Sequence, residues 1–130
     1  MKALLALMAF YLCGLCSVAA DQKASSISTA RAAIEANLNT PEGKAYDQQL
    51  GKELVEHHAE RMRQCKQTAG GDQDGFWMLL KLEKDGSVNE ILLTPETKIG
   101  QCDREVLNKA KFSAPPHDHY WVGVFVRITH

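Results

Sequence analysis

Residues 76–94, FWMLLKLEKDGSVNEILLT, contain two short apolar runs joined by an Asp-Gly pair. The residues of the first run that share one face of a strand are Phe76, Met78, Leu80 and Leu82. Asp85-Gly86 predicts a tight turn in which both residues take positive φ. The returning strand covers 88–94 and stops at Pro95. This stretch therefore predicts a β-hairpin.

A helix and a long strand are predicted downstream of the hairpin. The helix covers 102–111, and Pro115-Pro116 ends it, because proline cannot continue a helix. The strand covers 120–129. Its side chains alternate between two faces, one with Tyr120, Val122, Val124, Val126 and Ile128 and the other with Trp121, Gly123, Phe125, Arg127 and Thr129.

Two helices are predicted upstream of the hairpin. The first covers 28–39 and follows a polar extension, 21–27. The second opens with Thr40 as N-cap, Pro41 in the first helical position and Glu42 in the first turn. Its inward stripe consists of Tyr46, Leu50, Leu54, His58, Met62 and Cys65.

The order helix, helix, strand, strand, helix, strand predicts an α+β fold with a three-stranded sheet. If the last helix runs back along the sheet, the third strand is antiparallel to the first and parallel to the second. An all-antiparallel sheet then requires the order 2-1-3. We expect the helices to cover one face of this sheet.

The chain begins like an exported protein. Residues 1–20 combine a basic start, an apolar run and small residues before Asp21, which predicts a signal peptide cleaved after Ala20. The mature chain, 21–130, has room for one domain. Since no second apolar run of membrane-spanning length follows, we expect a periplasmic or secreted protein without a stable membrane anchor.

The charge balance excludes one class of partner. Without Lys2, the 15 basic residues become 14 against 16 acidic ones, a net charge of −2. A domain that binds nucleic acid normally carries a basic stripe. A nucleic-acid partner is therefore not expected.

Two of the four cysteines, Cys65 and Cys102, lie in the predicted mature chain. In an oxidising compartment they have one available pairing, which would tie the end of the second helix to the start of the third. The alternative is a pair of buried free thiols.

Half of the mature chain resembles a known family. The residues that carry the likeness are LKLEKDGSVNEILL, ETKIGQCDREVLNKAKF and SAPPHDHYWVGVFV. Their order (strand, Asp-Gly turn, strand, helix with a cysteine near its start, double proline, final strand) resembles the C-terminal domains of the periplasmic bridging proteins TonB and TolA.

The resemblance implies a non-enzymatic module that binds protein partners through sheet edges and adjoining loops. Two departures limit it. The family's transducers have an uncleaved anchor and a long spacer, which are not recognised in this chain. The first cysteine of TolA-type domains lies close to the first strand, whereas Cys65 lies on the preceding helix about ten residues upstream.

No catalytic, cofactor or metal site is predicted. The chain has no Gly-x-Ser-x-Gly motif and no Gly-rich phosphate loop, and a disulfide would remove the thiolate of Cys65. His117 and His119 flank Asp118 and could share a metal ion, but two ligands are a weak signal, and surface histidines in a polar loop are the preferred interpretation. His58 is interpreted as a half-buried core residue.

The predicted partner-binding surface is the edge of the last strand with the loop before it. Its residues are Pro115, Pro116, His117, His119, Tyr120, Trp121 and Phe125. Trp77 and Leu79 would extend the patch. The alternative is that Trp121 and Phe125 complete a core beneath the first helix.

The leading functional hypothesis is a module that binds an envelope or periplasmic protein. A second hypothesis is an inhibitor or immunity protein whose loop, His117 to His119, plugs an envelope-targeting enzyme. A hydrolase or metal-dependent enzyme is a third hypothesis, which the missing catalytic constellation disfavours. Neighbouring genes for envelope components or for a toxin would discriminate the first two.

Overall fold

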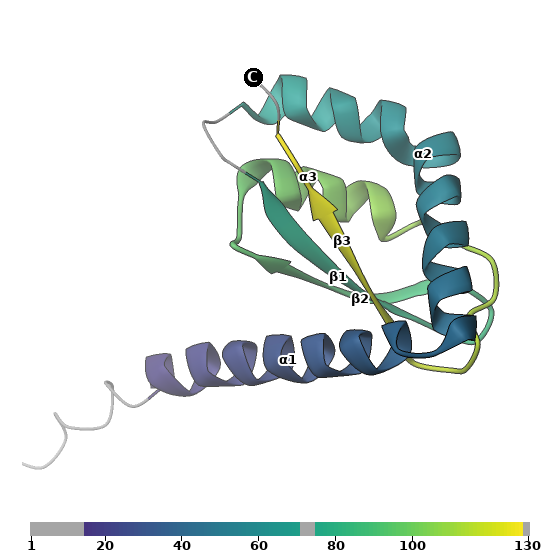
Figure 1. Ribbon diagram of the computed structural model, residues 1–130. Helices are drawn as coiled ribbons and strands as arrows, with labels where there is room; N and C mark the ends of the chain where they lie inside the picture. The colour runs from purple at the N-terminus through teal and green to yellow at the C-terminus, as the bar shows by residue number, and fades with distance from the viewer. Residues whose placement is uncertain (1–14, 71–74, 129–130) are drawn as a thin grey trace, which may run out of the picture.

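The computed structural model describes residues 15–70 and 75–128, and its three strands form one antiparallel sheet (Figure 1). The strands are β1 (Phe76–Leu82), β2 (Val88–Thr94) and β3 (Tyr120–Val126). β1 lies in the centre and pairs with both neighbours, so that the order is β2-β1-β3. The predicted α+β fold and its 2-1-3 sheet are confirmed.

The turn between β1 and β2 is stabilised by a side chain. Gly86 has φ 89°, and its N–H donates to the Glu83 carbonyl at 2.9 Å. The Asp85 carboxylate accepts hydrogen bonds from the N–H and the hydroxyl of Ser87, at 3.0 and 2.6 Å. The tight turn is confirmed, but the expected positive φ of Asp85 is wrong, because this residue bonds its own following backbone instead.

Gly86→Ala is expected to destabilise the protein by about 2 kcal/mol or more. A Cβ at this position would lie 1.9 Å from the Phe112 carbonyl oxygen, and the positive φ is unfavourable for alanine. Gly51→Ala is the matched control, since a Cβ there meets nothing within 4 Å and the residue lies inside a helix. It should stabilise by up to about 1 kcal/mol. Urea unfolding of both variants checks the pair, and equal effects would contradict the steric argument.

Helix α2 (Pro41–Ala69) begins where the sequence predicts. The Thr40 hydroxyl accepts a hydrogen bond from the Gly43 N–H at 3.0 Å, as an N-cap should. Along the predicted stripe, Tyr46, Leu50 and Cys65 are buried and the remaining positions are half-buried. The helix bends in its course around the sheet (Figure 1).

Helix α3 (Lys98–Leu107) begins and ends four residues earlier than predicted. Its start is set by Thr97, whose hydroxyl accepts the Gly100 N–H at 2.9 Å. After Leu107 the chain leaves the helix and runs to the hairpin turn, where the Phe112 N–H donates a hydrogen bond to the Gly86 carbonyl at 2.9 Å. The expectation that Pro115-Pro116 ends this helix is therefore wrong.

Helix α1 (Leu15–Leu38) is longer than the predicted helix 28–39. The expected polar extension, 21–27, is helical, since it contains neither glycine nor proline. Most of the predicted signal peptide, 1–14, lies outside the described residues, and cleavage after Ala20 stays a prediction. No helix within the described ranges has the length and apolar character needed to cross a membrane.

The helices lie on both faces of the sheet, and the expectation that they cover one face is wrong (Figure 1). On the first face the core joins β1 residues to α2 and α3, and its members include Tyr46, Leu50, Phe76, Met78, Leu80, Leu82, Ile99 and Leu107. On the opposite face Ile34 of α1 lies over Gly123, 3.4 Å from where a Cβ would stand. Leu79, which also points to this face, is 1% exposed.

The predicted disulfide between Cys65 and Cys102 is present, with an S–S distance of 2.06 Å and a Cα–Cα distance of 5.6 Å. It joins the last part of α2 to the middle of α3, rather than to its start, because α3 begins earlier than predicted. Both helices lie on the same face of the sheet. The bridge therefore holds together the two helices that cover the core.

Strand β3 ends at Val126, three residues before the predicted end. Val126 pairs with Phe76, the first residue of β1, in the last pair of the ladder between the two strands. Ile128 is nevertheless buried against the core. Thr129 lies outside the described residues.

Candidate protein-binding surface

Strand β3 is an edge strand whose outer side has open backbone groups. Asn37 of α1 donates a side-chain hydrogen bond to the Trp121 carbonyl at 3.0 Å, so this carbonyl points away from β1. In an antiparallel pair alternate residues point the same way, which places the N–H and C=O groups of Gly123 and Phe125 on the outer side too. Among the described residues, no hydrogen bond from another element reaches these groups. The free edge therefore begins after Trp121.

A groove of about 290 Å³ lies between this strand and α2. The residues that line it are Leu54, Val55, Ala59 and Met62 from α2 and Val124, Phe125, Val126 and Arg127 from β3. Its walls are apolar except for Arg127. Val55 is 68% exposed, an unusual exposure for a β-branched apolar side chain on a long helix. The groove places apolar side chains beside the free edge of β3.

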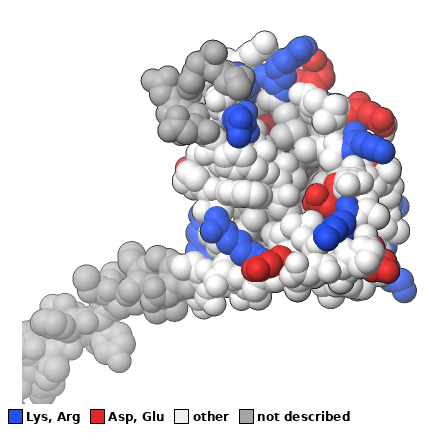
Figure 2. All heavy atoms as spheres, viewed as in Figure 1, with Lys and Arg blue, Asp and Glu red and all other residues white. Residues whose placement is uncertain are grey.

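Trp77 and Phe125 form an exposed aromatic pair on the face that α1 partly covers. They are paired in register across β1 and β3, and their ring centroids are 5.1 Å apart. Trp77 is 41% exposed and Phe125 is 45% exposed. On the face drawn in Figure 2, uncharged side chains form a broad area, with Lys, Arg, Asp and Glu side chains above it, below it and to its right. Exposed aromatic side chains of this kind are common in protein interfaces.

Trp121 is separated from this pair by α1. It points to the same face as Phe125, but Ile34 lies over Gly123 between them. Trp121 is half-buried, and the Lys81 ammonium lies 5.7 Å from the centre of its ring. The sequence left open whether Trp121 and Phe125 are exposed together or packed beneath the first helix. In the structure Phe125 is exposed, whereas Trp121 is partly covered by α1. Leu79 is buried and does not extend the exposed patch.

A second hollow of about 370 Å³ runs along α1 on the same face. It is lined by Arg31, Ile34, Glu35, Leu38, Asn39, Trp77, Leu79 and Gly123. Leu38 is exposed at its margin. Both hollows adjoin the Trp77–Phe125 pair, because Trp77 lines the hollow along α1 and Phe125 lines the groove beside α2.

The proline loop before β3 is held against α2. The Tyr46 hydroxyl donates to the Ser113 carbonyl at 2.7 Å, and the Glu53 carboxylate accepts the Ser113 N–H at 2.9 Å and its hydroxyl. These bonds lower the pKa of Glu53, the side-chain bond from Ser113 most strongly. Pro115 is buried and Pro116 is exposed.

Tyr120 is buried at the entry to β3 and is not accessible to a partner. Its ring packs edge-on against Tyr46, with centroids 5.3 Å apart, and against His117, at 4.8 Å. Burial raises the pKa of the Tyr120 hydroxyl. Tyr120 and Pro115, both predicted in the binding surface, therefore position the loop rather than face solvent.

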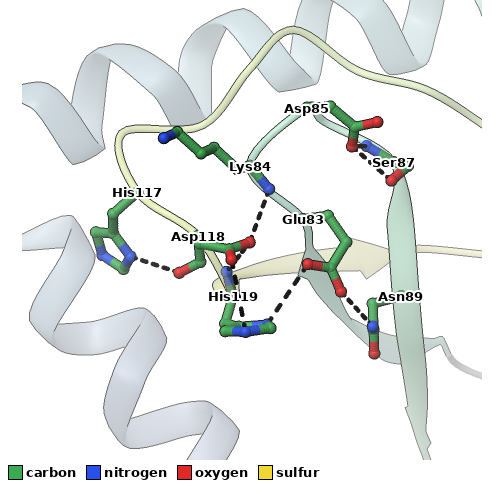
Figure 3. A network of polar contacts seen from close by, with 8 residues as sticks. All are labelled: Glu83, Lys84, Asp85, Ser87, Asn89, His117, Asp118 and His119. Atoms are coloured by element: carbon green, nitrogen blue, oxygen red, sulfur yellow. Dashed lines mark hydrogen bonds and ion pairs between the residues drawn. The ribbon is translucent and has the colours of Figure 1, made fainter.

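His117 and His119 are both exposed but do not face a common point (Figure 3). His117 Nδ1 lies 2.8 Å from the Asp118 carbonyl oxygen. His119 has φ 52°, and its ring approaches Glu83 at the end of β1. His58 is half-buried against Phe112, as predicted, and burial lowers its pKa.

One buried ionisable residue was not recognised from the sequence. Asp103 is 1% exposed on α3, and within the described ranges neither of its carboxylate oxygens has a hydrogen-bond partner. Burial raises the pKa of this carboxyl to about 7. Its spacing of four residues from both Ile99 and Leu107 indicates that Asp103 lies on the inward face of α3. This spacing is informative only when the helix is known to begin at Lys98.

Comparison with protein-family models, with curated proteins and with solved structures finds no match. The resemblance to TonB and TolA C-terminal domains therefore stays a prediction, carried by the order of strands, turn, helix and prolines in the sequence. The geometry of the β3 edge is the feature that indicates a function.

Proposed function

We propose that this protein is an exported, non-enzymatic protein-binding module that takes up an extended segment of an envelope or periplasmic partner along the free edge of β3. The observation that carries the proposal is the outward N–H and C=O groups of Gly123 and Phe125 beside an apolar groove. An added strand can bond such groups through its own backbone. The resemblance to TonB and TolA domains, which engage partners through sheet edges, supports the same conclusion.

The surroundings of the edge define the segment that fits. Side chains of an added strand alternate between two faces. On one face they meet the Trp77–Phe125 pair, and on the other they meet Val55 and Met62 of α2. We therefore expect a segment with apolar side chains on both faces. The bond from Asn37 to the Trp121 carbonyl occupies the start of the edge, so the segment pairs with the later part of β3.

Phe125 variants separate the aromatic anchor from the backbone edge. A random ten-residue peptide library displayed on phage serves as the probe, and selected peptides are titrated while tryptophan fluorescence is followed. Phe125→Ala removes the ring and should weaken binding about tenfold, the loss typical of an interface anchor. Phe125→Pro also removes an outward N–H and should weaken binding further, while the bonds to β1 stay intact.

Glu90→Ala on β2, the opposite edge of the sheet, is the control and should leave the affinity unchanged. Circular dichroism checks that each variant is folded. Peptides that bind the Phe125 variants as tightly as the original protein, or that lose affinity only with the β2 variant, would contradict binding at the β3 edge.

A further inference from the structure

A cluster of three ligand-bearing side chains lies at the end of the sheet, away from the groove beside α2. Glu83 follows β1, while Asp118 and His119 precede β3, so that the pairing of these strands brings them together. One ligand atom from each residue lies within 4.8 Å of the others. Figure 3 shows the three side chains directed toward one another.

Neighbouring groups orient the two carboxylates, each through one of its oxygens. Asp118 Oδ1 accepts the N–H groups of Lys84 and His119, at 2.8 and 3.0 Å. Glu83 Oε1 accepts a hydrogen bond from the Asn89 side-chain amide. The oxygens that remain, Asp118 Oδ2 and Glu83 Oε2, are those that approach the His119 ring, each at 3.6 Å from one of its nitrogens.

The charge of the cluster favours a cation. Two carboxylates within 4.8 Å repel each other, and His119 is the side chain between them. The Lys84 ammonium extends away from the pair (Figure 3). A divalent ion placed among the three side chains would offset this repulsion and use ligand atoms that are already oriented.

We propose that Glu83, Asp118 and His119 form a binding site for a divalent transition-metal ion of the zinc class. Imidazole nitrogen with carboxylate oxygen is a donor set that such ions accept, whereas calcium and magnesium prefer oxygen alone. Ligands about 2.1 Å from a tetrahedral zinc ion lie roughly 3.4 Å apart. The observed 3.6 Å between His119 Nδ1 and Glu83 Oε2 is close to this separation, and a ligand atom of Asp118 lies within 4.8 Å of the other two.

The ligand set differs from the His117–His119 pair that the sequence suggests. His117 turns toward the Asp118 carbonyl and the Tyr120 ring. The partners of His119 in the proposed site are instead Glu83 and Asp118. A bound ion would join the loop before β3 to the turn after β1. The site is independent of the proposed edge binding, and either can fail without the other.

The test uses Zn²⁺ alone, titrated into the untagged protein by calorimetry after treatment with a chelator and its removal. Wild type should bind one equivalent, and its melting temperature should rise with added Zn²⁺. Glu83→Gln, Asp118→Asn and His119→Ala should each weaken binding tenfold or more. His117→Ala is the matched control, a histidine of the same loop outside the ligand set, and should retain the wild-type affinity.

A second probe distinguishes the ligand set from adventitious binding. Co²⁺ in a site with three protein ligands should give a visible absorption spectrum that His119→Ala abolishes and that His117→Ala and His57→Ala preserve. Absence of one-equivalent Zn²⁺ binding by wild type at micromolar concentration would overturn the proposal. Equal loss in His117→Ala, or loss in His57→Ala with retention in His119→Ala, would overturn it as well.

Discussion

Replacing both cysteines of the bridge, Cys65→Ala with Cys102→Ala, is expected to lower the free energy of unfolding by about 4 kcal/mol. The bridge closes a loop with a sequence separation of 37, and its loss enlarges the conformational freedom of the unfolded chain. Loss of the bridge also removes the covalent link between α2 and α3, the two helices that cover the core face of the sheet. Since small domains are stable by only about 5–15 kcal/mol, this is a large share of the total.

Urea unfolding monitored by circular dichroism measures the effect, and the oxidised wild type is compared with the same protein in a reductant. The reduced wild type should unfold at nearly the same urea concentration as the double variant. Intact-mass measurement should show the isolated wild type two hydrogens lighter than its reduced form. Stability that is equal in the presence and absence of reductant would contradict a structural role of the bridge.

Asp103→Asn is expected to stabilise the protein by on the order of 3 kcal/mol at pH 8 and to have little effect near pH 4. Burial raises the pKa of Asp103 from 3.8 to about 7, so the folded state binds this proton more tightly than the unfolded state does. The stability that this proton provides is complete below about pH 4 and is lost as the pH rises through about 7. About three pKa units correspond to roughly 4 kcal/mol, reduced by the buried amide of the variant.

Unfolding free energies from pH 4 to pH 9 check this prediction. The wild type should become less stable between pH 4 and pH 7, and Asp103→Asn should remove most of that slope. Glu105→Gln, an exposed position on the same helix, should leave the wild-type profile unchanged. If the free energies of unfolding of wild type and Asp103→Asn depend on pH in the same way, ionisation of the Asp103 carboxyl does not destabilise the folded state, and the prediction is wrong.

Much of the fold could be predicted because its signals are local. The alternation in 76–82, the Asp-Gly pair and Pro95 lie within twenty residues and predict the hairpin without knowledge of the rest of the chain. Thr40 followed by Pro41 predicts the start of α2 for the same reason. The sheet order then follows from chain direction alone.

The candidate binding surface could be predicted only in part. Its location on the last strand follows from the 2-1-3 order, which leaves this strand at an edge. Which residues of the strand are accessible depends on the helices. Val55, which lines the groove beside β3, gives no signal in the sequence, because an exposed valine on a helix is recognisable only when the strand beside it is placed.

By itself, the sequence determined the hairpin, the strand order and the pairing of Cys65 with Cys102, because these depend on short-range patterns or on a single available partner. Only the tertiary structure decided that α1 lies on the face opposite α2 and α3. An amphipathic helix can bury its stripe on either face of a sheet, and here Gly123 leaves room for Ile34 on the second face. The same long-range packing buries Asp103, separates Trp121 from Phe125 and brings His119 to Glu83.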